Sequence, residues 1–463
     1  MANLKKTMFR EYDLRGLVSE SELNEKTVEI IAKAHGTMLR KRNVDRCIVG
    51  YDYRPTSESF HNAVIRGLKS TGVNVVDIGL VLTPMAYSAQ YHYKCKGVAM
   101  VTASHNPNEW SGFKLGMDYS HTLIPEEMKE LYNLCLSEDF SWGEGKVEKK
   151  DFYEDYTKDV LSRVKLSKKI KVVFNAGNGT PGAIVPKILR KAGCEVVELM
   201  TNLDWNFPRY YPNPSLVEMM KDTGDKTKEV KADIGIALDG DGDRLGITDE
   251  KGETIWPDRY MILLARQTLE KHPGAKIIFE VKCTQALEED IKDHGGIPIM
   301  WITGHSYIKD KAKKENAPLG GEMSGHIFFG PPDYYGFDDG VFGVLRVLDY
   351  LSRQTKTLSQ LISGTPYYIS TPTLHVDCGD EVKYQVVEKL TKEFKDEGCE
   401  VIDINGARVK FGDGWGLVRA SSNLPVLVLR FEAKTKERLE EIIKIFKDKF
   451  AKYPEIGKEW KSG

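Results

Sequence analysis

Short apolar runs alternate with amphipathic stretches along most of the chain. The runs are four or five residues long and lie at Cys47–Gly50, Val98–Val101, Ile170–Phe174, Ile234–Leu238 and Lys276–Phe279. Runs of this length, rich in β-branched residues and separated by helix-like stretches, indicate buried strands that alternate with helices. The pattern therefore predicts α/β layers with mixed or mainly parallel sheets over most of the chain.

One helix–glycine–strand pattern occurs four times. In each copy a charged helical stretch ends at a glycine and a β-branched run follows, and the glycines are Gly72, Gly193, Gly295 and Gly398. A glycine after a helix suits a left-handed backbone conformation that a Cβ would disfavour. The glycines recur at intervals of roughly 100 to 120 residues, the size of a domain, so we expect four units.

Polar segments with glycine or proline predict the boundaries between these units. Residues 137–151 are expected to be a linker, residues 249–253 a turn, and residues 363–373 a hinge. The expected units are residues 1–146, 147–250, 251–366 and 367–463. The last unit is expected to be α+β, with strands at 374–376, 400–404 and 426–431 around helices at 381–397 and 434–452.

Composition is that of an ordinary globular protein. Of the 463 residues, 41% are hydrophobic and 29% charged, and 66 Lys and Arg against 68 Asp and Glu leave a net charge of −2. This balance argues against a nucleic-acid-binding protein, and no apolar run reaches the roughly 20 residues that a bilayer requires. The N-terminus lacks the apolar region of a signal peptide, and the seven cysteines are scattered, so we expect reduced thiols in a cytoplasmic protein. Nothing indicates an apolar interface, which favours a monomer.

An acidic motif, DGDGDR at residues 239–244, follows the apolar run at 234–238. Alternate side chains of extended backbone point to one side, so the three carboxylates would repel one another unless a cation lay between them. Carboxylate oxygens suit Mg²⁺. An EF-hand would need glycine at its sixth position, where the chain has Arg244, and a solvated acidic turn is the remaining alternative.

A second motif, TASHNP at residues 102–107, also follows an apolar run. Ser104 could be a nucleophile or phosphoryl carrier, and His105 could handle a proton or donate to phosphate oxygens. By itself the motif is more typical of a helix cap or an Asx turn. A hydrolase triad is not supported, because the chain has no G-x-S-x-G elbow.

A third motif, GNGTPG at residues 177–182, matches the G-x-G-x-x-G pattern of dinucleotide-binding dehydrogenases. Pro181 removes a backbone N–H where a pyrophosphate would need one, so we disfavour that alternative.

The loop GEMSGH at 321–326 suits a polyhydroxylated ligand, because a Glu can accept hydrogen bonds from two adjacent sugar hydroxyls. Residues 419–423 (RASSN), preceded by GDGWG at 412–416, suit a phosphate. Either segment by itself is equally typical of an ordinary polar loop or turn.

Together these loops resemble the α-D-phosphohexomutase family, and within it the bacterial phosphomannomutase/phosphoglucomutases. The resemblance covers nearly the whole chain, with one motif per unit in the family's order. FREYDLRG at residues 9–16 resembles the N-terminal signature, and Lys282 and Gly304–Ser306 also match. The resemblance implies three similar α/β domains with mixed sheets and a C-terminal α+β domain around a central cleft.

The resemblance also implies roles for individual residues. Ser104 would carry a phosphoryl group, and a phosphoserine oxygen would complete a Mg²⁺ site made by Asp239, Asp241 and Asp243. The implied catalytic residues are Ser104, His105, Arg15, Lys114, Arg244, His305 and His326, of which Lys114, His305 and His326 are candidates for proton transfer. The implied substrate-binding residues are Glu322 and Ser324 for the sugar hydroxyls, and Tyr12, Lys282, Arg419, Ser421, Ser422 and Asn423 for the phosphate that is not transferred.

The implied reaction is the reversible interconversion of hexose 1-phosphates and 6-phosphates of mannose and glucose. It would use Mg²⁺ and proceed through glucose 1,6-bisphosphate or mannose 1,6-bisphosphate, which would reorient in the site. Small phosphosugars are then the expected partners, with no nucleic acid and no membrane. Two residues depart from family patterns: Leu424 removes a hydroxyl from the phosphate loop, and Met323 replaces the Gln usual in glucosamine mutases, which favours hexoses. The alternatives are a phosphoglucosamine mutase and a sugar phosphatase with a serine nucleophile.

Overall fold

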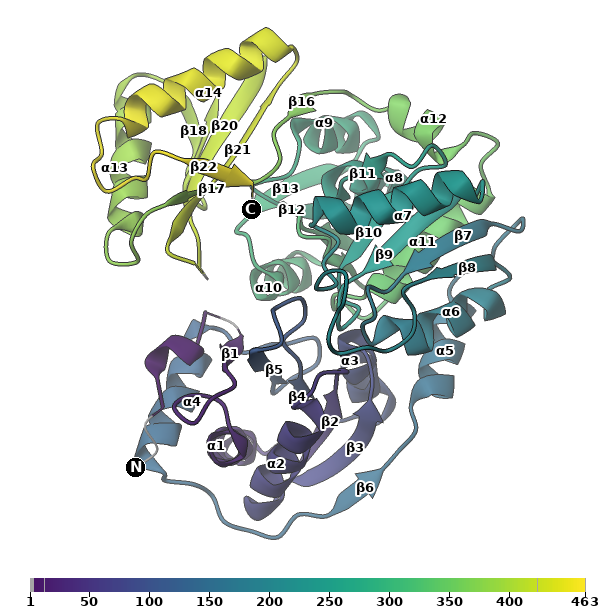
Figure 1. Ribbon diagram of the computed structural model, residues 1–463, viewed down its shortest axis with the longest axis vertical. Coiled ribbons are helices and arrows are strands. Elements are labelled where there is room, and N and C mark those ends of the chain that lie inside the picture. The colour runs from purple at the N-terminus through teal and green to yellow at the C-terminus, as the bar shows by residue number, and fades with distance from the viewer. Residues whose placement is uncertain (1–3, 12, 423, 463) are drawn as a thin grey trace.

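Four β-sheets with helices packed on them follow one another along the chain (Figure 1). This computed structural model describes residues 4–11, 13–422 and 424–462. The first three sheets mix parallel and antiparallel pairs, and the fourth is antiparallel among the described strands. The predicted architecture of three α/β units and a final α+β unit is therefore confirmed.

The first unit has a six-stranded sheet in the order β1-β5-β4-β2-β3-β6. Its strands are β1 (Leu14–Leu17), β2 (Arg46–Tyr51), β3 (Asn74–Leu80), β4 (Gly97–Val101), β5 (Trp110–Gly116) and β6 (Val147–Lys149), and its helices are η1 (Lys6–Met8), α1 (Glu25–Lys41), α2 (Ser57–Ser70), α3 (Thr83–His92) and α4 (Pro125–Ser137). Alternate residues of β4 point to opposite faces, so Val98 and Met100 pack with α3 while Ala99 and Val101 pack with α1 and α2. Burial on both faces explains why this strand is a continuous apolar run.

The second and third units repeat this layered arrangement with shorter sheets. The second has the order β11-β10-β9-β7-β8, with β7 (Lys171–Asn175), β8 (Glu195–Leu199), β9 (Ile234–Leu238), β10 (Leu245–Thr248) and β11 (Thr254–Ile255), and helices α5 (Tyr153–Ser162), α6 (Pro181–Lys191) and α7 (Val217–Glu229). The third has the order β13-β12-β14-β15, with β12 (Lys276–Glu280), β13 (Ile297–Trp301), β14 (Leu319–Gly321) and β15 (Ile327–Phe329), and helices α8 (Pro257–Lys271), α9 (Gln285–Asp293), α10 (His305–Glu315), α11 (Gly340–Ser352) and α12 (Leu358–Ser363).

The last unit is a sheet in the order β18-β19-β20-β21-β17-β22, with β16 pairing to β21. Its strands are β16 (Ile369–Ser370), β17 (Leu374–Asp377), β18 (Glu400–Ile402), β19 (Ala407–Lys410), β20 (Gly414–Ala420), β21 (Val426–Ala433) and β22 (Trp460–Ser462), and its helices are α13 (Lys383–Asp396) and α14 (Lys436–Phe450). Both helices pack on the central strand β20.

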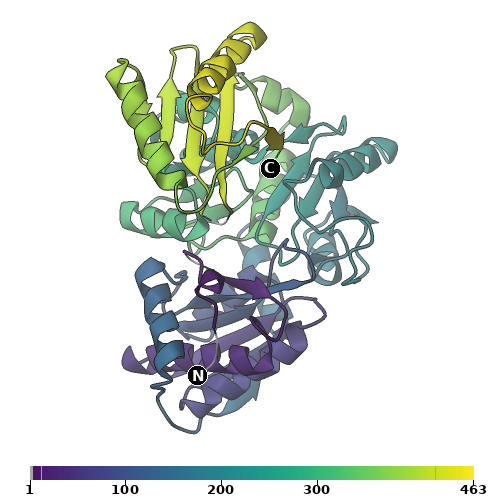
Figure 2. The same ribbon diagram turned by 60° about the vertical axis from the view of Figure 1, so that its left-hand side comes forward.

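One buried apolar cluster runs through the first three units, whereas the last unit has its own. Figures 1 and 2 show the first unit (purple) and the last unit (yellow) at opposite ends of the molecule, each against the middle units. A small cluster of Val281, Trp415 and Leu417 joins the third unit to the last. The first three units therefore form one body, onto which the last unit docks.

Local expectations from the sequence are mostly confirmed. The four glycines that end helices all have positive φ, at 83°, 97°, 72° and 82° in chain order. The expected linker at residues 137–151 contains the strand β6, and the expected hinge at residues 363–373 contains β16; the linker and hinge roles stay predictions. Both strands are very short and partly or wholly exposed, so they carry no run of apolar residues. The strand expected at 400–404 ends at Ile402.

All seven cysteines are free and six of them are buried, as expected for reduced thiols. The expected cytoplasmic location and monomeric state stay predictions. In the part of the chain that the structure describes, none of the helices has the length and apolar character needed to cross a membrane.

Candidate active site

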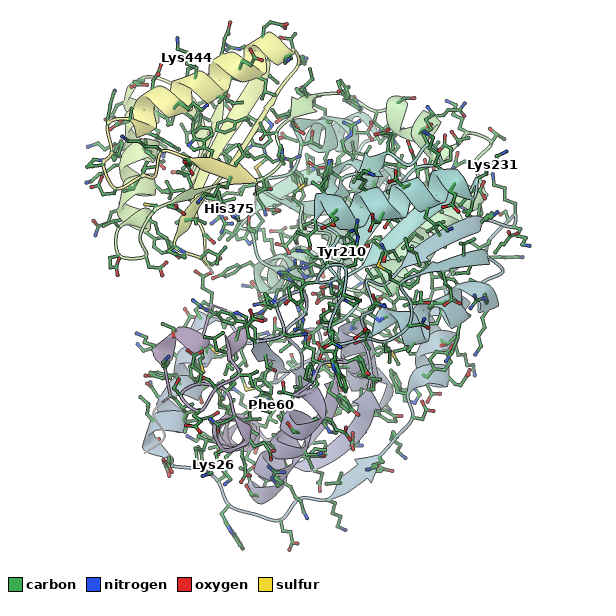
Figure 3. All side chains as sticks on the ribbon, in the orientation of Figure 1. Lys26, Phe60, Tyr210, Lys231, His375 and Lys444 are labelled. Atoms are coloured by element: carbon green, nitrogen blue, oxygen red, sulfur yellow. The ribbon has the colours of Figure 1, made fainter. Side chains whose placement is uncertain are left out.

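A cavity of about 500 Å³ lies where loops of all four units meet. Its lining includes Arg15, His105, Lys114, Arg244, Lys282, His305, Glu322, Ser324, His326, His375, Arg419, Ser421 and Ser422. Figure 3 labels His375, where the last unit faces the middle of the molecule. Arginine and lysine outnumber acidic residues in the lining, so the cavity suits an anionic ligand.

Ser104 lies beside this cavity, in the loop after β4. Its backbone has φ of 51°, and its N–H donates to Thr102 Oγ1 at 2.8 Å. The hydroxyl donates to Asp239 Oδ2 at 2.5 Å and lies 3.0 Å from His105 Nδ1. The loop of TASHNP therefore meets the loop of DGDGDR through the serine side chain.

Asp239, Asp241 and Asp243 form a fully buried cluster after β9. One carboxylate oxygen from each lies within 4.8 Å of the other two, and Asp239 Oδ1 accepts three backbone N–H groups from the residues that follow it in the loop. The Oδ1 atoms of Asp241 and Asp243 have no hydrogen-bond partner in the described structure. Burial and the charges of Asp243 and Asp241 raise the pKa of Asp239 well above its usual value. Buried, mutually repelling carboxylates with unused oxygens fit a divalent cation.

Lys114 is the cation of this cluster. Its Nζ on β5 lies 2.9 Å from Asp241 Oδ2 and also contacts Asp243 Oδ2. Burial by itself would lower the pKa of Lys114, but Asp241 and Asp243 raise it well above the usual value. One ammonium therefore pairs with two of the three carboxylates.

Two arginines flank His105. Arg15 Nη1 donates to Asn106 Oδ1 at 2.5 Å, and Arg244 Nη1 lies 3.5 Å from His105 Nε2. Burial, followed by the charges of Arg244 and Arg15, lowers the pKa of His105 well below its usual value. The ring beside Ser104 is therefore neutral, and its protonated form is disfavoured by the two neighbouring guanidinium groups.

The loop between β14 and β15 carries Glu322, Ser324 and His326. Glu322 Oε1 accepts the N–H of Gly304 at 2.6 Å, and Oε2 lies 3.1 Å from His326 Nδ1. Burial opposes ionisation of Glu322, but the His326 contacts lower its pKa to about 2. Burial would lower the pKa of His326, but Asp243 3.5 Å away raises it to about 9. This loop is thus tied directly to the acidic cluster.

His305, the first residue of α10, contacts two buried carboxylates that the sequence analysis missed. Its Nε2 lies 3.3 Å from Asp13 Oδ1, and its Nδ1 lies 4.0 Å from Asp338 Oδ2. Asp338 also lies 3.8 Å from His326 Nε2. Asp13 lies within FREYDLRG, which was a usable signal, whereas nothing in the local sequence distinguishes Asp338.

The residues expected to bind the second phosphate line the far side of the cavity. Lys282 follows β12, and Arg419 lies near the end of β20, with Ser421 and Ser422 just beyond that strand. Tyr12 and Asn423 lie outside the described residues. The preceding turn at 412–416 is not part of this group, because it lies at the other end of β20, where Asp413 pairs with Arg438 at 2.9 Å.

The glycines of GNGTPG serve packing between loops. A Cβ on Gly182 would come within 2.1 Å of a backbone oxygen, and one on Gly179 within 3.1 Å of the Gly240 Cα. Thr180 accepts the N–H of Tyr53 at 2.9 Å and donates its own N–H to Gly240. The GNGTPG loop therefore packs against the acidic loop at Gly240.

The chain matches family models in order along nearly its whole length. The matching models are phosphoglucomutase/phosphomannomutase alpha/beta/alpha domain I at residues 6–142, domain II at 150–252, domain III at 256–368, and the C-terminal domain at 374–449.

Individual proteins are also similar to it throughout. A phosphomannomutase/phosphoglucomutase of Pseudomonas putida is 40% identical over 446 residues, which cover 96% of this chain and 96% of that protein. A phosphoglucomutase of Neisseria gonorrhoeae is 39% identical over 452 residues and covers 96% and 97% of the two chains. The crystal structure of a phosphoglucomutase/phosphomannomutase family protein from Burkholderia thailandensis superposes with a TM-score of 0.91 at 36% identity, covering 98% and 99%.

Proposed function

The chain belongs to the phosphoglucomutase/phosphomannomutase family, and on that premise we propose that it interconverts the 1-phosphates and 6-phosphates of mannose and glucose. Ser104 carries the phosphoryl group, and a bisphosphorylated hexose turns over in the site between two transfers. The contact of Ser104 Oγ with Asp239 at 2.5 Å carries this proposal. A serine hydroxyl in contact with a buried carboxylate cluster beside a cationic cavity supports the role of phosphoryl carrier.

The residues that would hold Mg²⁺ are Asp239, Asp241 and Asp243, with an oxygen of the Ser104 phosphate as a further ligand. When bound, Mg²⁺ neutralises charge on the phosphoryl group that is transferred. Arg15, His105 and Arg244 line the same end of the cavity and donate to the phosphate oxygens. Glucose 1,6-bisphosphate or mannose 1,6-bisphosphate is then both the intermediate and the reagent that phosphorylates Ser104.

Each transfer exchanges one P–O bond for another. In the first, the bond between phosphorus and Ser104 Oγ breaks, phosphorus bonds to a sugar hydroxyl oxygen, and the hydroxyl proton passes to a base. In the second, the phosphate at the other end of the sugar returns to Ser104, and the freed sugar oxygen takes a proton. Among the three proton-transfer candidates we favour His305, which lines the cavity without contacting the acidic cluster. Burial lowers the pKa of His305, so its ring is neutral before the transfer, the form that a general base requires.

The sugar end of the cavity suits a ligand that binds in two orientations. Turning a hexose end for end roughly exchanges O3 and O4, so one carboxylate, Glu322, can serve both poses. Lys282 and Arg419 supply positive charge for whichever phosphate is not being transferred. The hydroxyl at C2 is then poorly recognised, which accommodates both mannose and glucose.

Met323 does not line the cavity, so rates on the two kinds of sugar, rather than this residue, decide discrimination against amino sugars. Its Sδ accepts from Arg430 Nη1 at 3.1 Å, and it is not among the described residues that line the cavity. Rates on glucose 6-phosphate and glucosamine 6-phosphate separate a hexose mutase from a phosphoglucosamine mutase. Release of inorganic phosphate in step with substrate loss would instead indicate a phosphatase.

The decisive test replaces Ser104 with alanine. We expect Ser104→Ala to lower mutase turnover on mannose 1-phosphate and glucose 1-phosphate by several orders of magnitude, because the phosphoryl carrier is lost. Intact-mass analysis should show one added phosphoryl group after wild-type protein is incubated with glucose 1,6-bisphosphate, and none on the variant.

The matched control is Ser352→Ala, which removes another buried, hydrogen-bonded serine hydroxyl far from the cavity. It should keep both turnover and the mass shift. A Ser104→Ala protein with near-normal turnover would rule out the mechanism.

A further inference from the structure

Arg54 lies beneath the loop that carries Ser104 and does not line the cavity. It follows β2, and 5% of its surface is exposed. Its Nη2 donates to the backbone oxygen of Ser104 at 2.6 Å, and its Nη1 donates to that of Pro107 at 3.3 Å. One guanidinium therefore holds both ends of the turn from 104 to 107.

Asp52 joins this guanidinium to the other side of the Ser104 peptide. Its Oδ2 accepts from Arg54 Nε at 3.2 Å and from Thr102 Oγ1 at 2.8 Å. Thr102 Oγ1 in turn accepts the N–H of Ser104 at 2.8 Å. Ser57 donates to the remaining oxygen of Asp52 at 2.6 Å. Both backbone polar groups of Ser104 are thus connected by hydrogen bonds to the carboxylate of Asp52, the carbonyl through Arg54 and the N–H through Thr102.

The conformation of Ser104 explains why this support is needed. A φ of 51° is uncommon for residues with a Cβ, and it persists where the surroundings determine it. Gly240 of the acidic loop packs closely against the same carbonyl, because a Cβ on this residue would lie 2.4 Å from Ser104 O. The ring centroid of Phe207 of the second unit lies 5.6 Å from the Arg54 guanidinium carbon, so the ring packs over the group.

We propose that Arg54, oriented by Asp52, is a positioning residue that holds Ser104 in the left-handed conformation from which its hydroxyl reaches the acidic cluster. This inference rests on the proposed function, because it concerns the alignment of the phosphoryl carrier. Arg54 touches neither the sugar nor the transferred phosphate in this arrangement. It acts through the backbone oxygen of Ser104, so it should affect the transfer step and leave hexose binding to the residues of the cavity.

The test compares Arg54→Met and Arg54→Lys with wild type in a coupled assay on glucose 1-phosphate, with glucose 1,6-bisphosphate present. We expect kcat to fall about 100-fold in Arg54→Met while KM stays within about threefold, because misplacing a reacting group costs rate more than affinity. Arg54→Lys should recover about tenfold of that loss, because an ammonium can pair with Asp52 but cannot donate along two fixed directions.

A second measurement separates positioning from general structural damage. Dephosphorylated enzyme is mixed with glucose 1,6-bisphosphate, and phosphorylation of Ser104 is followed by intact mass in a single turnover. A positioning role lowers the rate constant and leaves the final phosphorylated fraction near that of wild type. A merely structural role lowers the fraction of competent protein and leaves the rate constant unchanged, which would overturn the proposal.

Arg346→Met is the matched control, because Arg346 is another buried arginine that pairs with an aspartate, Asp333, and stacks on a phenylalanine, Phe329. It should keep the wild-type rate constant. An equal loss of the rate constant in Arg54→Met and Arg346→Met would overturn the inference. A kcat for Arg54→Lys within twofold of wild type would also overturn it, and this result can be obtained even if Arg54→Met fails to fold. Wild-type protein with neither turnover nor a mass shift would instead overturn the proposed function, and the role of Arg54 with it.

Discussion

The three aspartates of the acidic cluster have unequal partners. Asp241 and Asp243 share the ammonium of Lys114, whereas the nearest cationic group to Asp239 is Arg244, whose Nε lies 4.0 Å from Oδ2. The raised pKa of Asp239 shows that its ionised form is disfavoured in the fold without a cation. Asp239 is therefore the carboxylate of the cluster whose charge is least compensated by the described side chains.

Asp239→Asn should change stability and activity in opposite directions. In EDTA we expect its Tm to equal or exceed that of wild type, because a neutral amide relieves the repulsion and can still accept the three backbone N–H groups. Turnover should fall by about 100-fold or more, because the metal site loses a ligand. Adding Mg²⁺ should raise the Tm of wild type and not of the variant. A variant that is less stable than wild type in EDTA would contradict this account.

Residue identity alone indicated some of these positions and not others. Ser104 and the aspartates stand in short motifs at the ends of apolar runs, so their chemistry could be read from the sequence. Asp338 and Arg54 could not, because each acts through contacts with residues far along the chain, such as His326 and Ser104. Such partners become visible only when the fold is known.

At the scale of elements, helix α11 begins at an unusual cap. Asp339 accepts the N–H of Phe342 at 2.8 Å and the hydroxyls of Tyr156 and Tyr334 at 2.9 and 2.8 Å. Burial raises its pKa to about 6 in spite of these bonds. The cap joins α5 of the second unit to the third unit, and its burial makes the folded chain favour the protonated carboxyl more than the unfolded chain does.

The stability of Asp339→Asn relative to wild type should therefore rise with pH. Below about pH 4 the carboxyl is protonated in both the folded and the unfolded chain. Between about pH 4 and pH 6 the carboxyl of Asp339 is ionised in the unfolded chain and still protonated in the folded chain, so the wild-type protein loses stability as the pH rises. The Asp339→Asn variant has no carboxyl to ionise at this position and does not lose this stability. From pH 5 to pH 7 the difference should grow by on the order of 1 kcal/mol and then level off. The measurement is the difference in thermal unfolding midpoint across that range, and a difference that falls with pH would contradict it.

Buried strands were predicted from the sequence, whereas short exposed strands were not. Strands β4 and β9 are buried at every position, so continuous apolar runs marked them within a residue or so. Strands β6 and β16 are short edge segments, and backbone pairing with β3 and β21 forms them without any apolar pattern. The helix ends at Gly72, Gly193, Gly295 and Gly398 were predictable because a left-handed residue favours glycine.

At the scale of the whole molecule, the last unit is attached mainly by polar contacts. Arg430 donates to Asp258 at 2.7 Å and contacts the backbone oxygen of Lys282, and Arg408 donates to the backbone oxygens of Val281 and Cys283. Both arginines are almost fully buried. Sequence periodicity predicted the number of units, but it could not show which surfaces face one another. The contacts are made by individual arginines that belong to no repeating pattern in the sequence.

Arg430→Met should loosen the docking of the last unit. It leaves Asp258 buried without its cation, which costs about 3–5 kcal/mol. We expect faster proteolysis in the segment 363–373 and a higher KM for hexose phosphates, because Arg419 and Ser421 belong to the unit that is released. Arg438→Met, which removes a surface arginine of the same unit, should change neither. Equal proteolysis of the two variants would show that Arg430 does not secure the interface.

The assembly of one cavity from four successive units has a consequence during protein synthesis. The nascent chain completes the serine loop and the acidic loop first, and the residues that bind the sugar and its distal phosphate leave the ribosome last. A prematurely terminated polypeptide that stops before Arg419 therefore has the serine loop and the acidic loop without the last unit's part of the cavity lining. If the proposed function holds, such a truncated product would lack the groups expected to hold the phosphate that is not transferred, and it should not complete the cycle.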